Sequence, residues 1–190
     1  ARSLAQLESR LPDALNVVFP GADRFRTAGV QTARGCPHRC IYCTYPRLEG
    51  TRLRRRPPEA VGDEMARFRR ELGAVEQFGV DASFNADEAH MVAVCEELRR
   101  RRSRPGAALA DVGFSCYLQP RVSDPGVFRL LAEAGCTSVD FGIDTAAEEL
   151  LPAFGKAFTV ADLRAATRAA LGARLDVCHS LLFGGPGETP

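Results

Sequence analysis

Residues 34–43 read Arg-Gly-Cys-Pro-His-Arg-Cys-Ile-Tyr-Cys and place three cysteines, Cys36, Cys40 and Cys43, in a C-x₃-C-x₂-C arrangement. A closed structural zinc site uses four protein ligands, so this loop alone leaves such a site one ligand short. Three thiolates on one tight loop can instead hold three corners of a cubane iron–sulfur cluster and leave the fourth iron open to a small molecule. The stretch therefore predicts a reactive cluster, and the rest of the chain can be interpreted around it.

A zinc site completed by His38 is the alternative interpretation of this loop. His38 lies two residues after Cys36, inside the same short stretch. A tetrahedral site requires ligands that approach the ion from four directions, and neighbours this close in one loop provide that geometry poorly. The cluster is the favoured interpretation.

The loop closely resembles the signature of the radical S-adenosylmethionine (SAM) superfamily, whose members hold a [4Fe-4S] cluster. Tyr42, directly before the third cysteine, fits the resemblance, because that position typically lies against the adenine of SAM. The resemblance implies that SAM chelates the open iron through its amino and carboxylate groups. It also implies that one electron from the cluster cleaves the sulfonium to give a 5′-deoxyadenosyl radical, with a flavodoxin- or ferredoxin-type reductant as the source.

The composition indicates one soluble domain. At 190 residues and 45% hydrophobic content, the chain can bury a substantial core, and its net charge of +1 gives no support to nucleic-acid binding. No apolar run approaches the length of about 18 residues that a membrane span needs, and no signal peptide is evident, so a cytoplasmic protein is expected. The four cysteines outside the loop have apolar neighbours and are expected to be buried thiols: Cys95, Cys116, Cys136 and Cys178.

Two regions are predicted along the chain. Residues 1–28 are punctuated by prolines and glycine and are interpreted as a lead-in or linker, whereas residues 29–190 are interpreted as the catalytic domain. The chain begins without methionine and stops at a Gly- and Pro-rich stretch just after a predicted strand. We therefore expect a domain excised from a longer protein.

Strand and helix patterns alternate from residue 30 onward. The predicted strands span residues 30–33, 75–80, 112–118, 138–143 and 175–183. Five helices are predicted. The first spans residues 58–72, the second runs from Asn85 to the arginine run 99–102, and the third runs from Asp124 to Gly135. A short fourth helix starts at Thr145, and the fifth runs from Thr159 to Gly172. Such alternation predicts an α/β fold with a parallel sheet.

The superfamily resemblance sharpens this fold class to a partial (β/α) barrel. Members usually have six strands, so five parallel strands are expected here and the sixth is expected to be missing. In parallel barrels the chemistry lies at the carboxyl ends of the strands, which is where the cysteine loop falls.

The ending of the second predicted strand departs from the common family pattern. Many members carry Gly-Gly-Glu there to hold the amino group of SAM, whereas this chain has Asp81-x-x-Phe84-Asn85. This pattern resembles the Asp-rich version in the subgroup with cobalamin-binding domains. The resemblance makes Asp81 and Ser83 candidates for contacting SAM; the alternative is a helix-entry turn in which Asp81 is a cap.

The later strands supply the other candidates for SAM contacts. On the third strand, Ser115 and Tyr117 share one face, and Cys116 and Leu118 share the opposite face. One of these two pairs is expected to face the barrel interior. The fourth strand ends in Gly142-Ile143-Asp144-Thr145, similar to a family ending that meets the ribose, which implicates Asp144. The fifth strand contributes Ser180 and then Gly184, whose neighbouring glycines would let the backbone approach adenine.

Lys156 is the one lysine among 25 basic residues. It follows Gly155, and this Gly-Lys resembles one that recurs after the fourth strand in the cobalamin-type subgroup. A site role and a solvated loop lysine are both open for it.

Three functions are weighed. The first is a cobalamin-dependent radical SAM enzyme of the methyltransferase type, with its cobalamin domain upstream of Ala1 and a small-molecule or peptide substrate. The second is a transfer-RNA methylthiotransferase, although the second strand lacks the Gly-Gln-Asn pattern expected of that group. The third is a zinc-stabilised nucleic-acid-binding module, for which the near-neutral charge gives little support.

Overall fold

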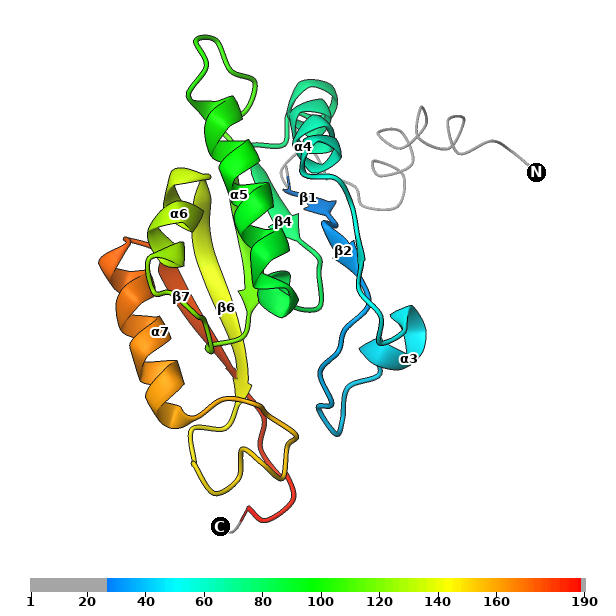
Figure 1. The fold of residues 1–190 in the computed structure, drawn as a ribbon, viewed down its shortest axis with the longest axis vertical. Coiled ribbons are helices and arrows are strands. Elements are labelled where there is room, and N and C mark those ends of the chain that lie inside the picture. The colour runs from blue at the N-terminus through cyan, green and yellow to red at the C-terminus, as the bar shows by residue number, and fades with distance from the viewer. Residues whose placement is uncertain (1–26, 189–190) are drawn as a thin grey trace, which may run out of the picture.

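The computed structural model describes residues 27–188, and a five-stranded sheet forms their centre (Figure 1). The strands lie in the order β1 (Thr27–Val30), β4 (Glu76–Gly79), β5 (Gly113–Leu118), β6 (Cys136–Asp144) and β7 (Asp176–Leu181), and each neighbouring pair is parallel. Spatial order follows chain order, as repeated right-handed βαβ units produce. The predicted five-stranded parallel fold is confirmed, while the predicted lead-in 1–28 lies almost wholly outside the described residues.

Helices connect the strands and lie along the sheet (Figure 1). They are α4 (Pro58–Leu72), α5 (Glu88–Arg102), α6 (Val127–Glu133) and α7 (Val160–Gly172). Helices α4 and α7 span the predicted residues. Helix α7 begins with a capping box, in which the Thr159 hydroxyl accepts from the Asp162 backbone N–H and the Asp162 carboxylate accepts from that of Thr159.

The first predicted strand is wrong in its bounds, because residues 30 and 33 belong to two different strands and residues 31 and 32 lie between them. Strand β1 ends at Val30, and β2 (Ala33–Arg34) pairs antiparallel with β3 (Arg54–Arg55). The cysteine loop and the short helix α3 (Tyr45–Glu49) lie between β2 and β3. This small ribbon therefore carries the loop beside the main sheet (Figure 1).

Helix α5 begins later than predicted. Asn85 lies in a 3₁₀ turn, η2 (Phe84–Ala86), and Asp87 caps α5 by accepting from the His90 backbone N–H at 3.1 Å. The Asn85 side chain is used elsewhere, since it accepts from the backbone N–H of Gln119 at 2.8 Å and donates to the Gln119 carbonyl at 2.9 Å. The Asn85 side chain therefore links the ends of β4 and β5, and the predicted helix start at this residue is wrong.

Two other helix predictions need correction. Asp124 does not open α6 directly, because its carboxylate accepts from the Gly126 backbone N–H at 2.8 Å in a turn before the helix. No helix starts at Thr145, whose hydroxyl accepts from the Ala147 backbone N–H at 3.2 Å in a turn. Both residues cap local turns, an alternative that short polar side chains offer the backbone.

The core lies between the sheet and the helices. Its largest fully buried side chains include Met91, Leu98, Leu118, Phe128, Leu131 and Phe141. The prediction of buried thiols is confirmed for Cys95, Cys116 and Cys136. It is wrong for Cys178, which is exposed because it lies on the edge strand β7.

The arginine run at the end of α5 is part of the structure of the domain. The guanidinium of Arg102 donates to the carbonyls of Leu109 and Ala110 at 2.6 and 3.2 Å, and Arg101 pairs with Glu97 at 2.6 Å. These groups close the loop after α5 in place of a wholly solvated helix end. No helix within residues 27–188 is long and apolar enough to cross a membrane.

The capping box predicts the cost of one substitution. Thr159→Ala removes the acceptor for the Asp162 backbone N–H, so the domain should lose about 1 kcal/mol, which lowers Tm by about 2–4 °C in a domain of this size. Thermal unfolding followed by circular dichroism measures the change. Thr159→Ser retains the hydroxyl and should unfold like the unsubstituted protein; equal losses for both variants would contradict the cap.

Candidate functional site

An open pocket of about 290 Å³ lies where the cysteine loop meets the carboxyl ends of three strands. The loop contributes all three motif cysteines to its wall. His38, Tyr42 and Tyr45 also line the pocket. The rest of the wall comes from the ends of β4, β5 and β6 and from the segment before α7: Phe78, Val80, Asp81, Ala82, Tyr117, Gln119, Gly142 and Lys156. The predicted location of the site at the strand ends agrees with this arrangement.

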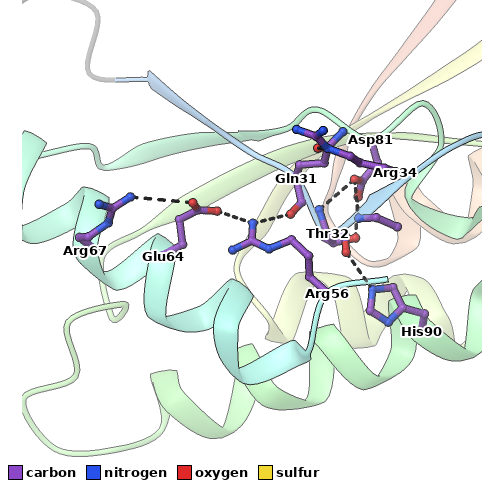
Figure 2. A network of polar contacts seen from close by, with 9 residues as sticks. Gln31, Thr32, Arg34, Arg56, Glu64, Arg67, Asp81 and His90 are labelled. Atoms are coloured by element: carbon purple, nitrogen blue, oxygen red, sulfur yellow. Dashed lines mark hydrogen bonds and ion pairs between the residues drawn. The ribbon is translucent and has the colours of Figure 1, made fainter. Parts of the chain in front are cut away.

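A buried carboxylate holds the start of the cysteine loop. Asp81 accepts from the backbone N–H groups of Thr32 and Ala33, both at 2.9 Å, and from the Thr32 hydroxyl at 2.6 Å. The imidazole Nε2 of His90 lies 3.3 Å from the Thr32 carbonyl oxygen (Figure 2). Burial raises the pKa of Asp81, and the three hydrogen bonds act against that rise. The strand end before the loop is therefore fixed from inside the domain.

Ion pairs from α4 support the same strand end (Figure 2). The Arg56 guanidinium donates to the Gln31 carbonyl at 2.7 Å and pairs with Glu64 at 2.5 Å. Glu64 in turn lies 3.9 Å from Arg67. The backbone N–H of Arg56 donates to the Thr32 carbonyl at 2.8 Å, so both sides of this turn are held.

A second contact holds the far end of the cysteine loop. The Ile41 backbone N–H donates to the Phe154 carbonyl at 3.2 Å. Gly155 has φ of +73°, and a Cβ on it would lie 2.4 Å from the Arg39 carbonyl oxygen. Only glycine allows the two backbones to approach this closely. The segment after β6 is thus packed directly on the cysteine loop.

The side chains of Tyr42, Asp144 and Lys156 form a compact polar group at this contact. The Tyr42 hydroxyl donates to Asp144, which also pairs with the Lys156 ammonium. The ammonium donates to the Tyr42 oxygen at 3.1 Å and to the Gly142 carbonyl at 2.8 Å. The Lys156 side chain is 2% exposed, so the solvated-loop interpretation of this lysine is wrong. Asp144 has φ of +64°, an uncommon backbone conformation for a residue other than glycine.

The thiol of Cys36 and the imidazole of His38 have shifted pKa values. Burial raises the pKa of Cys36, and the neighbouring thiols of Cys43 and Cys40 act in the same direction, while the Lys156 charge acts against them. Burial lowers the pKa of His38, with the Lys156 charge as a second cause. The Nε2 atom of His38 is buried and has no hydrogen-bond partner.

The predicted SAM contacts divide into two groups. Tyr42 and Asp81 line the pocket, although the Asp81 oxygens already accept from Thr32 and Ala33. Asp144 does not line it, since its buried carboxylate is paired with Tyr42 and Lys156. The structure therefore assigns both carboxylates a role in holding the loop, and their contact with SAM stays a prediction.

The remaining candidates lie away from the pocket wall. The Ser83 hydroxyl donates to Asn85 at 2.9 Å, and that of Ser180 donates to Asp140 at 2.9 Å. The Gly184 backbone N–H donates to the Glu188 carboxylate. Ser115 is not among the residues that line the pocket. Contact of these residues with SAM stays untested.

Several residues of the wall were not among the predicted SAM contacts. Tyr117 lies two residues beyond Ser115 on the same face of β5, so the strand alternation contained the signal, and the carboxyl-end rule favours Tyr117. Phe78 packs against Tyr117 with the rings perpendicular and 5.2 Å apart. Gln119, directly after β5, carried no pattern that would have selected it.

The three thiols provide a donor set that fits an iron–sulfur cluster. Cys36, Cys40 and Cys43 line one pocket and come from one loop, whose turn is closed by a 3.1 Å bond from the Cys43 backbone N–H to the Cys40 carbonyl. Within residues 27–188, no three His, Cys, Asp or Glu side chains are grouped so as to hold a single metal ion. Thiolates bound to a cluster reach different iron atoms and are spaced accordingly.

The parallel α/β fold with a three-cysteine loop at its strand ends defines a class of cluster-binding catalytic domain. A family model for the Radical SAM superfamily matches residues 30–190. The chain belongs to this superfamily, which confirms the predicted cofactors, a [4Fe-4S] cluster and SAM.

Two curated relatives cover most of this chain. Tryptophan 2-C-methyltransferase of Streptomyces laurentii is 32% identical over 169 residues, which are 84% of this chain and 28% of the relative. Ribosomal protein uS12 methylthiotransferase RimO of Desulfosudis oleivorans is 31% identical over 172 residues, which are 86% of this chain and 38% of the relative. The chain thus spans well under half the length of these relatives.

Two solved structures are similar to this chain in fold. The radical SAM methyltransferase TsrM from Kitasatospora setae, with tryptophan substrate and a SAM analogue bound, superposes with a TM-score of 0.83 and 32% identity over 89% of this chain and 32% of that one. The cobalamin-dependent SAM radical enzyme OxsB superposes with a TM-score of 0.66 at 21% identity over 84% of this chain and 24% of that one, and so shares the fold.

Two glycines test how tightly the segment after β6 packs on the cysteine loop. Gly155→Ala should destabilise the protein by about 2–4 kcal/mol, because a left-handed alanine is strained and its Cβ meets the Arg39 carbonyl. Gly106 has a similar φ of +69° but open space around it, so Gly106→Ala should show the backbone strain alone, about 1 kcal/mol.

Urea denaturation of the cluster-free protein measures both variants, and iron content after reconstitution should fall only in Gly155→Ala. Equal effects of the two substitutions would show that the close approach does not hold the loop.

Proposed function

We propose that this domain generates the reactive species of a cobalamin-dependent radical SAM enzyme of the methyltransferase type. The observation that carries the proposal is the single pocket formed by the three thiols and the strand ends. The 32% identity to a tryptophan 2-C-methyltransferase over 84% of the chain supports the methyltransferase class. TsrM, solved with cobalamin and a [4Fe-4S] cluster bound, supports cobalamin as a second cofactor.

Each group of residues has a defined part in this proposal. Cys36, Cys40 and Cys43 hold the cluster, and the ring of Tyr42 lies against the adenine of SAM. A cluster bound there supplies the electron that cleaves the sulfonium of SAM. The ring of Phe78 and the side chain of Val80 form an apolar wall, which limits the access of water to the site. The substrate, a small molecule or a peptide, would enter beyond SAM.

A methylthiotransferase is the second candidate function. It is favoured by the 31% identity to RimO over 86% of the chain. The residues after β4 read Val-Asp-Ala-Ser-Phe-Asn and lack the Gly-Gln-Asn pattern that the methylthiotransferase resemblance requires. Methyl transfer that depends on added methylcobalamin separates the two candidates.

Reconstitution of the purified protein with iron and sulfide under anaerobic conditions tests the proposal. The protein should bind about four irons, as a [4Fe-4S] cluster requires, and the reduced form should give an electron paramagnetic resonance signal that changes when SAM is added. Products of SAM should then appear as 5′-deoxyadenosine, methionine or S-adenosylhomocysteine. A colourless protein with one zinc and no SAM turnover would overturn the proposal.

Cys40→Ala should abolish SAM turnover while leaving the fold largely intact, because Cys40 is a half-buried loop residue outside the core. Cys178→Ala is the matched control, since this exposed thiol lies on β7 away from the pocket. Iron content, circular dichroism and product formation check both variants. Turnover of the Cys40→Ala variant at the unsubstituted rate would remove Cys40 from the cluster.

An acidic flavodoxin or ferredoxin is part of the proposal as the electron donor. Residues 34–56 contain seven arginines and one acidic residue, Glu49, a net charge of +6 in a chain of net charge +1. Arg39, Arg47 and Arg52 are exposed around the cysteine loop. Such a charge distribution accelerates encounter with an acidic protein.

Replacing Arg47 and Arg52 together by glutamate should slow flavodoxin-driven SAM turnover by about tenfold at low salt, because complementary charge raises the association rate. Turnover driven by dithionite should be unchanged, since this small reductant needs no docking surface. An equal loss with both reductants would show that the arginines support the site itself and not the donor.

A further inference from the structure

Lys156 is the only lysine of the chain, and its ammonium is buried at the edge of the pocket. Three acceptors surround it: the Asp144 carboxylate, the Tyr42 oxygen at 3.1 Å and the Gly142 carbonyl at 2.8 Å. A lysine ammonium has three donors, so each has a partner. Burying this charge is costly unless it is paired and hydrogen-bonded, and the arrangement meets both conditions.

The three acceptors come from two parts of the fold. Gly142 and Asp144 lie on β6, whereas Tyr42 lies in the cysteine loop between Cys40 and Cys43. The ammonium therefore joins the cysteine loop to the end of the sheet. It also lies 5.5 Å from the centre of the Tyr42 ring, within the range of a cation–π contact.

The backbone next to Lys156 reinforces this link. The Phe154 carbonyl accepts from Ile41, and Gly155 packs on the Arg39 carbonyl. The Phe154 ring contacts the Tyr42 ring edge to face, with the centres 6.5 Å apart. Three consecutive residues thus contact the loop, and Lys156 is the one whose side chain reaches the Tyr42 hydroxyl.

We propose that Lys156 is a positioning residue for SAM, acting through Tyr42 and Asp144 to set the orientation of the Tyr42 ring and of the loop that carries Cys40 and Cys43. This inference rests on the proposed function, in which Tyr42 lies against adenine. Tyr42 is 47% exposed, so packing alone does not fix its ring. Binding SAM to a ring already held in place requires less ordering, and preorganisation of this kind raises affinity.

Lys156→Met tests the proposal, because methionine retains the length of the side chain and removes its charge and donors. After reconstitution the variant should still bind iron, while its Kd for SAM should rise about tenfold, the scale of a lost charge-assisted hydrogen bond. The SAM-dependent change in the electron paramagnetic resonance signal of the reduced cluster measures Kd. Without any cluster, trypsin should cleave faster after the exposed Arg39 than in the unsubstituted protein.

A double-mutant cycle with Tyr42→Phe distinguishes positioning from a merely structural role. Because Lys156 acts through the Tyr42 hydroxyl, the double variant should bind SAM no more weakly than Lys156→Met alone. Losses that multiply would show that the two side chains act independently and would overturn the proposal. Equal SAM affinity in Lys156→Met and the unsubstituted protein would also overturn it.

Chemical rescue keeps the test decisive if Lys156→Met folds poorly. Lys156→Ala leaves space that opens on the pocket, so propylammonium should restore SAM affinity and slow the cleavage after Arg39, whereas propanol should not. Restoration by both compounds, or by neither, would count against the role of the charge. If adding SAM did not change the electron paramagnetic resonance signal of the reduced cluster in the unsubstituted protein, the proposed function itself would be overturned.

Discussion

The cysteine loop has to present three thiols to one pocket although little hydrogen bonding within the loop supports it. It is held at its two ends by buried carboxylates. Asp81 accepts from the backbone N–H groups of Thr32 and Ala33, just before the loop. Asp144, which is paired with Lys156, accepts from the hydroxyl of Tyr42, the residue before the third cysteine of the loop. Buried carboxylates are stable only when their oxygens are paired, so removal of either set of partners would leave a buried charge uncompensated.

This arrangement changes the role assigned to the acidic residues at the strand ends. A carboxylate at the end of a parallel strand is a natural candidate for a ligand contact, and both Asp81 and Asp144 were predicted to meet SAM. In the folded domain their oxygens face protein donors. The wall of the pocket is instead more aromatic and apolar, with Phe78, Val80 and Tyr117 at the ends of β4 and β5. Asp81, Tyr42 and Lys156 thus both hold the loop and line the pocket, whereas Asp144 only holds the loop.

The alignments show what fraction of each relative this domain matches. This chain aligns with 28% of a tryptophan 2-C-methyltransferase and 38% of a methylthiotransferase, two classes with different products. The part of this chain that aligns contains the cysteine loop and the parallel sheet behind it.

The sequence alone determined the chemistry and the order of the elements. Three cysteines in ten residues predicted the cluster, and helix 58–72 and the helix start at Thr159 were predicted correctly, because spacing, periodicity and helix-start patterns are local properties. The tertiary structure alone decided which side chains meet. Asp81 forms hydrogen bonds with Thr32, which is 49 positions away in the sequence, and Tyr42 forms one with Asp144, which is 102 positions away. Local patterns cannot specify such pairs, since they exist only once the parallel strands bring their carboxyl ends together. For the same reason the sequence left a site role and a solvated loop both open for Lys156, and only the fold shows it as the buried cation that joins the loop to the sheet.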